Sequence, residues 1–242
     1  MSEKVLVSRS EGVLWLAFNR PEKKNAFDRQ SYVALIGALD EARRDAAVRA
    51  VVFSGVGADF TAGNDLGDFR DFMENLEDFP ALTFVRTLAA FEKPMVAAVT
   101  GDAIGVGATM LFHCDLVYAT QQARLRMPFI DLGLVPEAGA SLLVPRRFGM
   151  ARASQYLLAG EDFSGDDAFR LGLVNALAEP EAVLETAMAA AKKLAQKPPA
   201  ALLAARRLMR GDPAEILARI DEEAALFAQA LASPTTRERL SA

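Results

Sequence analysis

The stretch KPMVAAVTGDAIGVGATMLFHCDLVYA, residues 93–119, carries the pattern that decides the fold class. An apolar run at 93–101 leads into a glycine-rich bend, a helical segment follows at 106–113, and a second apolar run occupies 114–120. Short apolar runs separated by a helix are typical of buried strands joined by crossover connections. The stretch therefore predicts one unit of an α/β core, and a further strand, ARLRMP at 123–128, follows it.

The residues before this stretch repeat the alternation of strands and helices. KVLVSRSEGVLWLAFNRP, 4–21, has two apolar runs on either side of a turn and predicts a hairpin. Apolar residues recur at helical spacing over 28–46, behind an aspartate suited to an N-cap, and 49–55 reads as a short apolar strand. Two helical pieces are expected next, around Phe69–Leu76 and Leu82–Phe91.

The character of the chain changes after about residue 148, where strands give way to helices that are broken at glycines and prolines. The expected helices occupy 150–159, 166–171, 181–197, 199–210 and 213–232. We therefore expect an α/β core over 1–175 and a helical C-terminal region over 176–242, without a flexible linker. The last helix has apolar residues on several sides, which fits either a partner subunit or packing across the core.

Composition limits the classes of function. The 242 residues are 52% hydrophobic and 24% charged, as in a globular protein, and a formal net charge of -5 argues against a broad nucleic-acid surface. The single cysteine, Cys114, and the single histidine, His113, lie among apolar residues and are interpreted as buried, so no metal site is expected. No signal peptide or membrane-spanning stretch is visible, and a cytoplasmic location is expected.

Two loops combine small residues with accessible backbone. DFTAGNDL, 59–66, follows a strand, and TGDAIGVGATM, 100–110, lies between a strand and a helix. In the second loop Gly105 and Gly107 bracket Val106 at the start of the helix, where its N–H points outward and the helix dipole favours negative charge. The spacing is not that of a dinucleotide- or phosphate-binding loop. From the glycines alone, a pair of tight turns explains the loops equally well.

Four motifs in register carry a resemblance to a known family. NRPEKKNAF at 19–27, FTAGNDL at 60–66, the run at 93–119 and DLGLVPEAGAS at 131–141 are similar to the crotonase (enoyl-CoA hydratase/isomerase) family, over about residues 5–175. The resemblance implies a spiral of ββα units followed by a helical trimerisation region, assembled as a homotrimer or a dimer of trimers. It also implies an acyl-CoA thioester substrate, so that coenzyme A enters with the substrate and no separate cofactor is needed.

Carried over position by position, the resemblance assigns the backbone N–H groups of Ala62 and Val106 to an oxyanion hole for the thioester oxygen. Removing one such donor typically costs roughly 3 kcal/mol of transition-state stabilisation. The backbone from Lys24 to Ala26 would meet the adenine end of coenzyme A. The other residues that the resemblance implies along the acyl-CoA path are Gly63, Asn64, Asp65, Leu66 and Gly105.

Hydratases of this family hold a water between two carboxylates. The matching positions carry Thr109 and Phe129, neither of which can act as general acid or base, so water addition by this route is not expected. A subset that resembles the peroxisomal-type Δ3,Δ2-enoyl-CoA isomerases has one catalytic glutamate after the LGLVP proline, and Glu137 stands there. Its apolar neighbours Leu134 and Val135 are expected to raise its carboxyl pKa by desolvation.

Glu137 also admits other interpretations. It is the only charged residue of VPEAGASLLVP, 135–145, and a structural carboxylate on a turn or at a helix N-terminus would give the same sequence. A dehalogenase-like branch of the family has a nucleophilic aspartate at this position, one methylene shorter than glutamate. A non-catalytic acyl-CoA-binding protein is the third alternative. The isomerase, an enzyme of fatty acid metabolism, is the function that the sequence favours.

Overall fold

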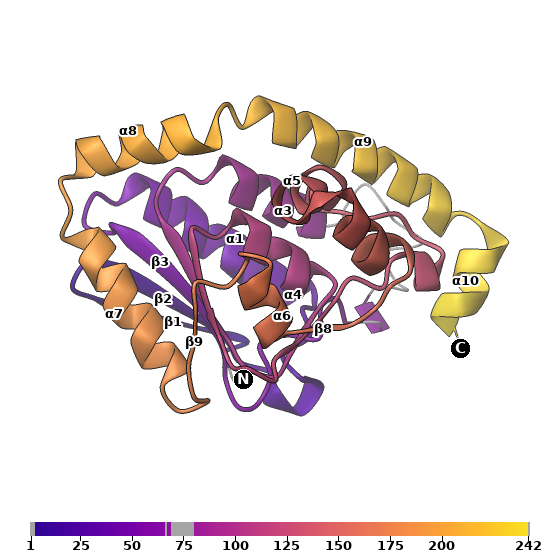
Figure 1. Ribbon diagram of the computed structural model, residues 1–242, viewed down its shortest axis with the longest axis horizontal. Coiled ribbons are helices and arrows are strands. Elements are labelled where there is room, and N and C mark those ends of the chain that lie inside the picture. The colour runs from indigo at the N-terminus through magenta and orange to yellow at the C-terminus, as the bar shows by residue number, and fades with distance from the viewer. Residues whose placement is uncertain (1–2, 66, 69–79, 242) are drawn as a thin grey trace.

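The main sheet of the protein has six strands in the order β1-β2-β3-β4-β6-β9 (Figure 1). The computed structural model describes residues 3–65, 67–68 and 80–241. The strands are β1 (Val5–Ser10), β2 (Val13–Phe18), β3 (Ala50–Gly55), β4 (Met95–Val99), β6 (Leu116–Ala119) and β9 (Ala176–Leu177). β1 and β2 form the predicted hairpin, and each later strand pairs parallel with its neighbour, as buried apolar runs predict.

Helices cover both faces of this sheet. The α-helices in the described residues are α1 (Arg29–Arg44), α3 (Pro80–Ala90), α4 (Val106–Thr109), α5 (Ala140–Ala153), α6 (Gly165–Arg170), α7 (Val183–Ala195), α8 (Pro199–Arg210), α9 (Ala214–Leu231) and α10 (Pro234–Ser241), and those on the two faces of the sheet include α1 and α7. Successive side chains of a strand point to opposite faces. Val51 and Phe53 of β3 accordingly share one core cluster with α1 and α3, while Ala50 and Val52 share the other with α7. The sheet is therefore buried on both sides.

A second, smaller sheet has the order β5-β7-β8. Its strands are β5 (Asp102–Ile104), β7 (Arg124–Arg126) and β8 (Phe163–Ser164). β5 follows β4 after a two-residue bend and leads directly into α4. The glycine-rich stretch 100–107 thus carries the chain from the main sheet to the smaller one, and this crossing is where the candidate site is built.

The C-terminal helices form an arm along one side of the molecule, with α8 and α9 end to end and α10 at the tip (Figure 1). α9 packs against α3 and α5 of its own chain, so the alternative of packing across the core holds for part of its apolar surface. On α8, by contrast, Leu208 and Met209 are 80% and 88% exposed. α8 therefore leaves two large apolar side chains exposed, of which Met209 also borders a hollow between this helix and the core.

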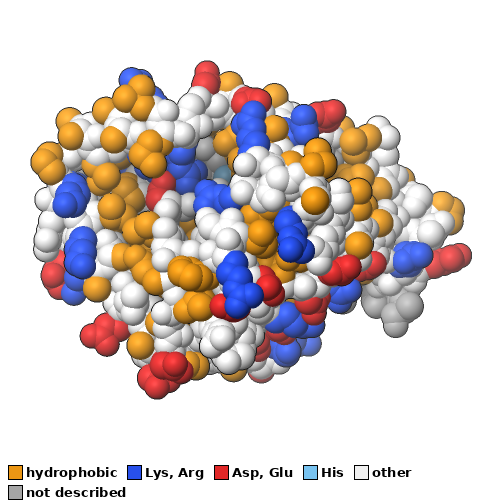
Figure 2. All heavy atoms as spheres, in the orientation of Figure 1, with side chains coloured by type: hydrophobic (Ala, Val, Ile, Leu, Met, Phe, Trp, Pro, Cys, Tyr) orange, Lys and Arg blue, Asp and Glu red, His pale blue; other side chains and the backbone are white. Residues whose placement is uncertain are grey.

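An acidic residue at the start of β6 ties α8 to the core. Asp115 accepts from Arg206 Nε at 2.9 Å and from Arg210 Nε at 3.0 Å. These arginines, together with Arg147, line a hollow of about 560 Å³ with His113 at its base, and Figure 2 shows basic side chains around it. His113 and Cys114 are both buried, as the sequence predicts.

Most expected elements are present. The helices predicted over 28–46, 166–171, 181–197, 199–210 and 213–232 correspond to α1, α6, α7, α8 and α9. Asp28 caps α1 by accepting from the Ser31 N–H at 2.9 Å. The helix expected over 150–159 is present as the last residues of α5 and the π-helical turn Ser154–Leu158 that continues them. Gly149, with φ of 75° and ψ of 161°, separates it from an earlier helical segment that begins at Ala140 and contains Pro145, and this earlier segment was not predicted because proline usually breaks a helix. The helical piece expected around Phe69–Leu76 lies outside the described residues.

The division of the chain after residue 175 stays a prediction. Two elements beyond it, β9 and α7, pack with the main sheet, so the first region and the start of the second share one core. None of the helices in the described ranges is long and apolar enough to cross a membrane. The expected cytoplasmic location stays a prediction.

Candidate active site

The two glycine-containing loops meet beyond the carboxyl ends of β3 and β4. The Thr61 N–H donates to the Asp102 carbonyl at 2.9 Å, and the Ile104 N–H donates to the Thr61 carbonyl at 3.0 Å. Gly63 has φ of +85°, and a Cβ there would lie 2.6 Å from the Ile104 carbonyl oxygen. Glycine is therefore required at this contact both by conformation and by space. The two loops therefore pack directly against each other, while the approach of a ligand to them stays a prediction.

The Ala62 amide is not available to a ligand. Its N–H donates to the Lys24 carbonyl at 2.8 Å, which corrects the prediction that Ala62 supplies an oxyanion donor. In contrast, the N–H groups of Asn64 and Val106 have no acceptor among the residues that the structure describes. Gly63 adopts a left-handed conformation, so the N–H groups of Ala62 and Asn64 on either side of it point in different directions. The order of residues in the motif does not show which of the two N–H groups is left without an acceptor.

Val106 opens α4, and its N–H lies at the first position of that helix, where no intrahelical acceptor exists. Gly105 before it has φ of 57° and ψ of −121°, a conformation that favours glycine, and nothing lies within 4 Å of a Cβ built there. At Gly107 a Cβ would lie 2.5 Å from Thr61 Cγ2, so this glycine lets α4 press against the first loop. The three residues together bring the Val106 amide beside the Asn64 loop.

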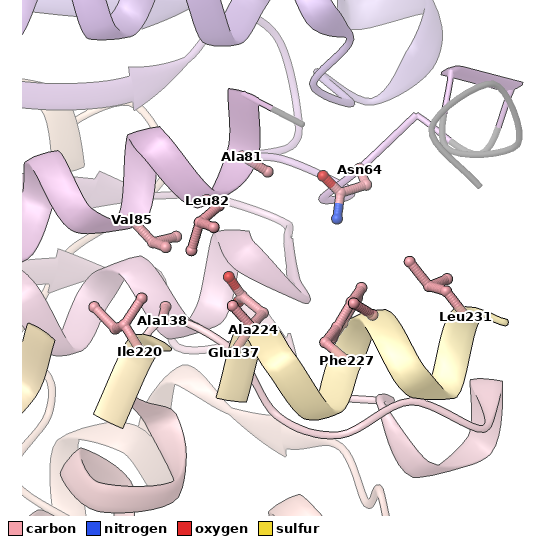
Figure 3. A pocket seen from close by; sticks show the side chains of 11 residues that line it. Asn64, Ala81, Leu82, Val85, Glu137, Ala138, Ile220, Ala224, Phe227 and Leu231 are labelled. Atoms are coloured by element: carbon pink, nitrogen blue, oxygen red, sulfur yellow. The ribbon is translucent and has the colours of Figure 1, made fainter. Parts of the chain in front are cut away.

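Glu137 lies in the loop before α5 and lines a cavity of about 80 Å³ (Figure 3). Thr109 Oγ1 donates to Glu137 Oε1 at 2.5 Å, so one turn of α4 connects the Val106 amide with this carboxyl group. Asn64 lines the same cavity. The other lining residues are Ala81, Leu82 and Val85 of α3, Ala138, and Ile220, Ala224, Phe227, Ala228 and Leu231 of α9. Among these described residues Glu137 is the single ionisable one, so the surroundings are apolar.

The turn after Glu137 has an unusual backbone. Ala138 has φ of 59° and Gly139 has φ of 72°, so two successive residues adopt the left-handed conformation. Such a conformation at a non-glycine residue persists only where the surroundings fix it. Here His113 Nε2 lies 2.8 Å from the Ala138 carbonyl oxygen and donates to it. Burial lowers the pKa of His113 to about 4, so the imidazole is neutral and serves as an anchor for the turn.

Burial also controls the protonation of Glu137. Desolvation raises its pKa to about 8; the hydrogen bond from Thr109 acts in the opposite direction, and the charge of Glu223 raises the pKa further. The residue as a whole keeps partial exposure, because it borders the cavity, while its carboxyl group lies deep beneath α9. The predicted rise in pKa is confirmed. A carboxyl group with this pKa can both accept and release a proton close to neutral pH.

The two hydratase positions have no acidic group. Thr109 is occupied by its bond to Glu137, and Phe129 is buried with 5% of its surface exposed. In the described residues no group of three or more histidine, cysteine or acidic side chains could hold a metal ion. The site as described combines one carboxyl group, two free amides and an apolar wall.

Sequence reasoning missed Tyr32. Its hydroxyl donates to Asn64 Oδ1 at 2.5 Å, and the residue is fully buried on α1. Burial, followed by the charge of Glu137, raises the Tyr32 pKa well above its ordinary value, so the phenol stays protonated and remains a donor. Tyr32 lies one turn before Leu35 on the same apolar stripe, and this spacing marked it as core without showing that its polar end holds Asn64.

The remaining predicted binding residues lie on the first loop or beside it. Lys24 Nζ pairs with Asp102 at 2.9 Å and its side chain is 59% exposed, while the Ala26 carbonyl accepts from Arg20 Nη1 at 2.7 Å. Asp65 pairs with Arg20 at 2.8 Å. Leu66 lies outside the described residues. Contact of any of these residues, including Gly105, with coenzyme A stays a prediction.

Comparisons with known proteins agree with this arrangement. A family model described as enoyl-CoA hydratase/isomerase matches residues 8–241. The chain belongs to this family. Among solved structures, Pseudomonas aeruginosa OdaA is similar with a TM-score of 0.95 and 44% identity, covering 99% of this chain and 98% of that one. The crotonase-like α/β fold expected from the motifs is therefore confirmed.

Relatives within the enoyl-CoA hydratase/isomerase family include both hydratases and isomerases. The 2,3-dehydroadipyl-CoA hydratase of Escherichia coli (strain K12) is 35% identical, covering 100% of this chain and 95% of that protein. Enoyl-CoA delta isomerase 2 of Rattus norvegicus is 36% identical, covering 92% of this chain and 58% of that protein. Overall identity thus leaves the reaction open, and the residues at the site have to separate the two classes.

Proposed function

We propose that this family member is a Δ3,Δ2-enoyl-CoA isomerase. The observation that carries the proposal is the set of groups at one cavity. Glu137 is the single carboxyl group among its described lining residues, and Thr109 and Phe129 occupy the positions that a hydratase needs for acids. Moving a double bond requires one base that returns its proton, whereas adding water requires groups that hold and activate the water.

The reaction needs two kinds of group from the chain. The N–H groups of Asn64 and Val106 would donate to the thioester oxygen and stabilise the negative charge that develops there; Asn64 takes the place first predicted for Ala62. The Glu137 carboxylate would remove a proton from C2, and the electron pair would spread over a dienolate. The double bond then lies between C2 and C3 when the same carboxyl group returns the proton at C4. No water, metal or second carboxylate enters these steps.

The local environment suits Glu137 to both half-reactions. Its pKa of about 8 leaves a deprotonated fraction at neutral pH and a proton that is readily returned. Tyr32 holds the Asn64 side chain at 2.5 Å, so the peptide that carries the Asn64 N–H is supported from α1. The apolar residues of α3 and α9 exclude water, which strengthens the interaction between the amides and a developing oxyanion.

Assembly forms a second part of the proposal. We infer that the chain forms a homotrimer or a dimer of trimers through the C-terminal arm, because Leu208 and Met209 of α8 leave large apolar side chains in solvent. The acyl-CoA substrate would enter with its adenine end toward Lys24 and Ala26, on the exposed side of the loops.

The experiment follows the conjugated 2-enoyl thioester by its absorbance after 3-enoyl-CoA substrates of short, medium and long chains are added. Glu137→Gln is expected to lower the rate by about 100- to 10,000-fold, because it removes the general base. The matched control is Asp131→Asn, since Asp131 is an exposed carboxylate on the short 3-10 helix Ile130–Leu132 before the Glu137 loop and pairs with Arg126. The control should keep the wild-type rate, and both variants should keep acyl-CoA affinity.

Three results would contradict the isomerase. Hydration of 2-enoyl-CoA without isomerisation of 3-enoyl-CoA would place the chain with the hydratases of the family. Release of halide from a halogenated aromatic acyl-CoA, abolished in Glu137→Gln, would support the dehalogenase-like alternative. Tight acyl-CoA binding without any turnover, and without solvent-deuterium exchange at C2 of a saturated acyl-CoA, would support the third alternative, a non-catalytic acyl-CoA-binding protein.

A further inference from the structure

A buried carboxylate of the C-terminal helix bonds to the turn that carries Glu137. Glu223, on α9, is only 4% exposed. Its Oε2 accepts from the Gly139 N–H at 2.6 Å, and its Oε1 accepts from the Ser141 N–H at 2.9 Å and from Ser141 Oγ at 2.5 Å. These amides belong to the start of α5, where a helix has N–H groups without intrahelical acceptors. Glu223 therefore acts as an N-terminal cap supplied by a different helix.

This cap acts on a segment that needs support. Ala138 and Gly139 both have positive φ, and the left-handed conformation is unfavourable for an alanine because its Cβ lies too close to the following carbonyl oxygen. His113 holds the Ala138 carbonyl from one side at 2.8 Å. Glu223 holds the Gly139 amide from the other side. The peptide units that follow Glu137 are thus fixed by two buried side chains, one from the core and one from the arm.

The same face of α9 closes the cavity. Figure 3 shows Ile220, Phe227 and Leu231 along α9, opposite the residues of α3 and beside Glu137. Glu223 lies on this buried face, between Ile220 and Phe227. When α9 packs in place, it therefore brings the cavity wall and the cap of the Glu137 turn together.

We propose that Glu223 is a positioning residue for Glu137, which makes docking of α9 a condition for a complete active site. This inference rests on the proposed isomerase function. Glu223 touches neither the reacting carbons nor the thioester in that mechanism. It acts through the backbone of Gly139 and through its negative charge.

The charge of Glu223 gives the inference a signature that a purely structural role lacks. Burial is the main cause of the raised Glu137 pKa, and the Glu223 charge adds to it. The other groups near Glu137 are the Thr109 hydroxyl, which donates to it, and the protonated phenol of Tyr32. Beside Glu223 itself, Arg219 lies close enough to donate to Ser141 Oγ at 3.3 Å. Removing the Glu223 charge should therefore lower the Glu137 pKa.

The test compares Glu223→Gln with Glu223→Asp and with Asp221→Asn. Glutamine fits the same space but replaces one accepting oxygen with a donor that faces N–H or O–H groups. Aspartate keeps the charge and both oxygens one methylene further back. Asp221 lies on the same helix and undergoes the same change of carboxylate to amide, but it is exposed and pairs with Arg86 at 2.9 Å. Three quantities are measured: kcat and KM with 3-enoyl-CoA, the thermal midpoint, and the pH at which the infrared band of the Glu137 carboxylic acid disappears.

For Glu223→Gln we expect kcat to fall about tenfold to hundredfold, as for a catalytic group displaced by about 1 Å, with a much smaller change in KM. The infrared midpoint should move to lower pH. Glu223→Asp should lower kcat and leave that midpoint near the wild-type value, because its charge remains. Asp221→Asn should match the wild type in all three quantities.

Two results would overturn the positioning role. One is a Glu223→Gln protein that folds and keeps the wild-type kcat and infrared midpoint. The other is a loss of activity that is fully explained by a smaller folded fraction and is equal in Glu223→Gln and Glu223→Asp. If Glu223→Gln is too unstable to study, the same comparison is made with Glu223→Asp alone. The infrared titration needs no turnover, so it still measures the effect of Glu223 on Glu137 if the wild type proves not to be an isomerase.

Discussion

At the scale of single residues, Glu137 satisfies two opposing demands. The apolar cavity raises its pKa and so strengthens it as a base once it is ionised. The hydrogen bond from Thr109, at 2.5 Å, stabilises the ionised form and limits that rise. A side chain without the hydroxyl at position 109 would leave the carboxyl group protonated over a wider pH range. The residue that replaces a hydratase carboxylate thus has a role of its own in tuning the remaining acid.

The raised pKa predicts how activity and stability depend on pH. The base must be ionised in the free enzyme, so kcat/KM should rise with pH and level off above about pH 8. The folded state binds a proton at Glu137 that the unfolded chain releases above pH 4.5, so stability is lost between pH 4.5 and about 8. Across that range the loss is about 1.4 kcal/mol per pH unit for one such group.

Glu137→Gln removes this titration. In urea unfolding, the variant should match or exceed the wild type in stability, and its advantage should grow from pH 5 to pH 8 and then stay constant. A difference in the free energy of unfolding that does not change with pH would show that Glu137 is not held in a protonated form by the fold.

What could be predicted at this scale depended on distance along the chain. Each of three features lies within a short contiguous motif and could be predicted from it: Glu137, Val106 and the absence of a carboxylate at Thr109. Glu223 is 84 residues from Gly139 in sequence and carries no mark of its partner there. The wrong assignment of Ala62 has a different cause, because the local turn at Gly63 decides which N–H of the motif is used.

At the scale of elements, the position of α4 depends on how closely it approaches the preceding loop. This short helix connects the Val106 amide with Thr109 and, through it, with Glu137. Gly107 on α4 leaves only enough room for Thr61, since an added Cβ would lie 2.5 Å from Thr61 Cγ2 and 3.0 Å from its carbonyl oxygen. Both the side chain and the backbone carbonyl of Thr61 would have to shift to make room for a Cβ at position 107.

Gly107→Ala should therefore push α4 from its place. We expect a loss of stability of about 1–3 kcal/mol from overpacking, and a fall in kcat larger than the loss of folded protein, since the Val106 amide moves with the helix. The control is Gly37→Ala on α1, where nothing lies within 4 Å of the new Cβ. That change should stabilise the protein by about 0.5–1 kcal/mol and leave kcat unchanged. Equal kcat values in both variants would argue against a tight α4 contact.

The long helices were predictable from the sequence, as were the short elements β7 and α6, whereas β5, β8 and β9 were not. The periodicity of α1, α7, α8 and α9 extends over 12 or more residues, enough for the spacing to identify a helix. β8 and β9 have 2 residues each and β5 has 3, so they contain no period and exist only through their partners. β5 nevertheless belongs to the site, because its pairing with the first loop positions the free amides.

At the scale of the whole molecule, the C-terminal arm has two roles. Its helix α9 lines the cavity, and its helix α8 leaves Leu208 and Met209 exposed to solvent. A monomer that exposes two large apolar side chains would gain by covering them. The resemblance to the family implied a trimer, whereas the apolar side chains themselves indicate only that this face is favourable for contact between copies.

Light scattering on the purified protein should give three or six times the mass of one chain. The double variant Leu208→Glu with Met209→Glu should lower the mass to that of one chain, because it places charges on the contact face. The control is Val33→Glu, since Val33 is 59% exposed on α1, outside the arm. A wild type with the mass of one chain, or a double variant that still assembles, would exclude this face as the interface.

The lone thiol of the chain has a practical consequence. Cys114 is buried, and burial raises its pKa to about 12. Only a thiolate reacts rapidly with alkylating reagents, so the native protein should remain inert to them. A cysteine engineered on the outer surface of α9 could then be labelled alone, in an otherwise unmodified chain, and a fluorophore placed there would measure how firmly this helix stays packed against the Glu137 turn.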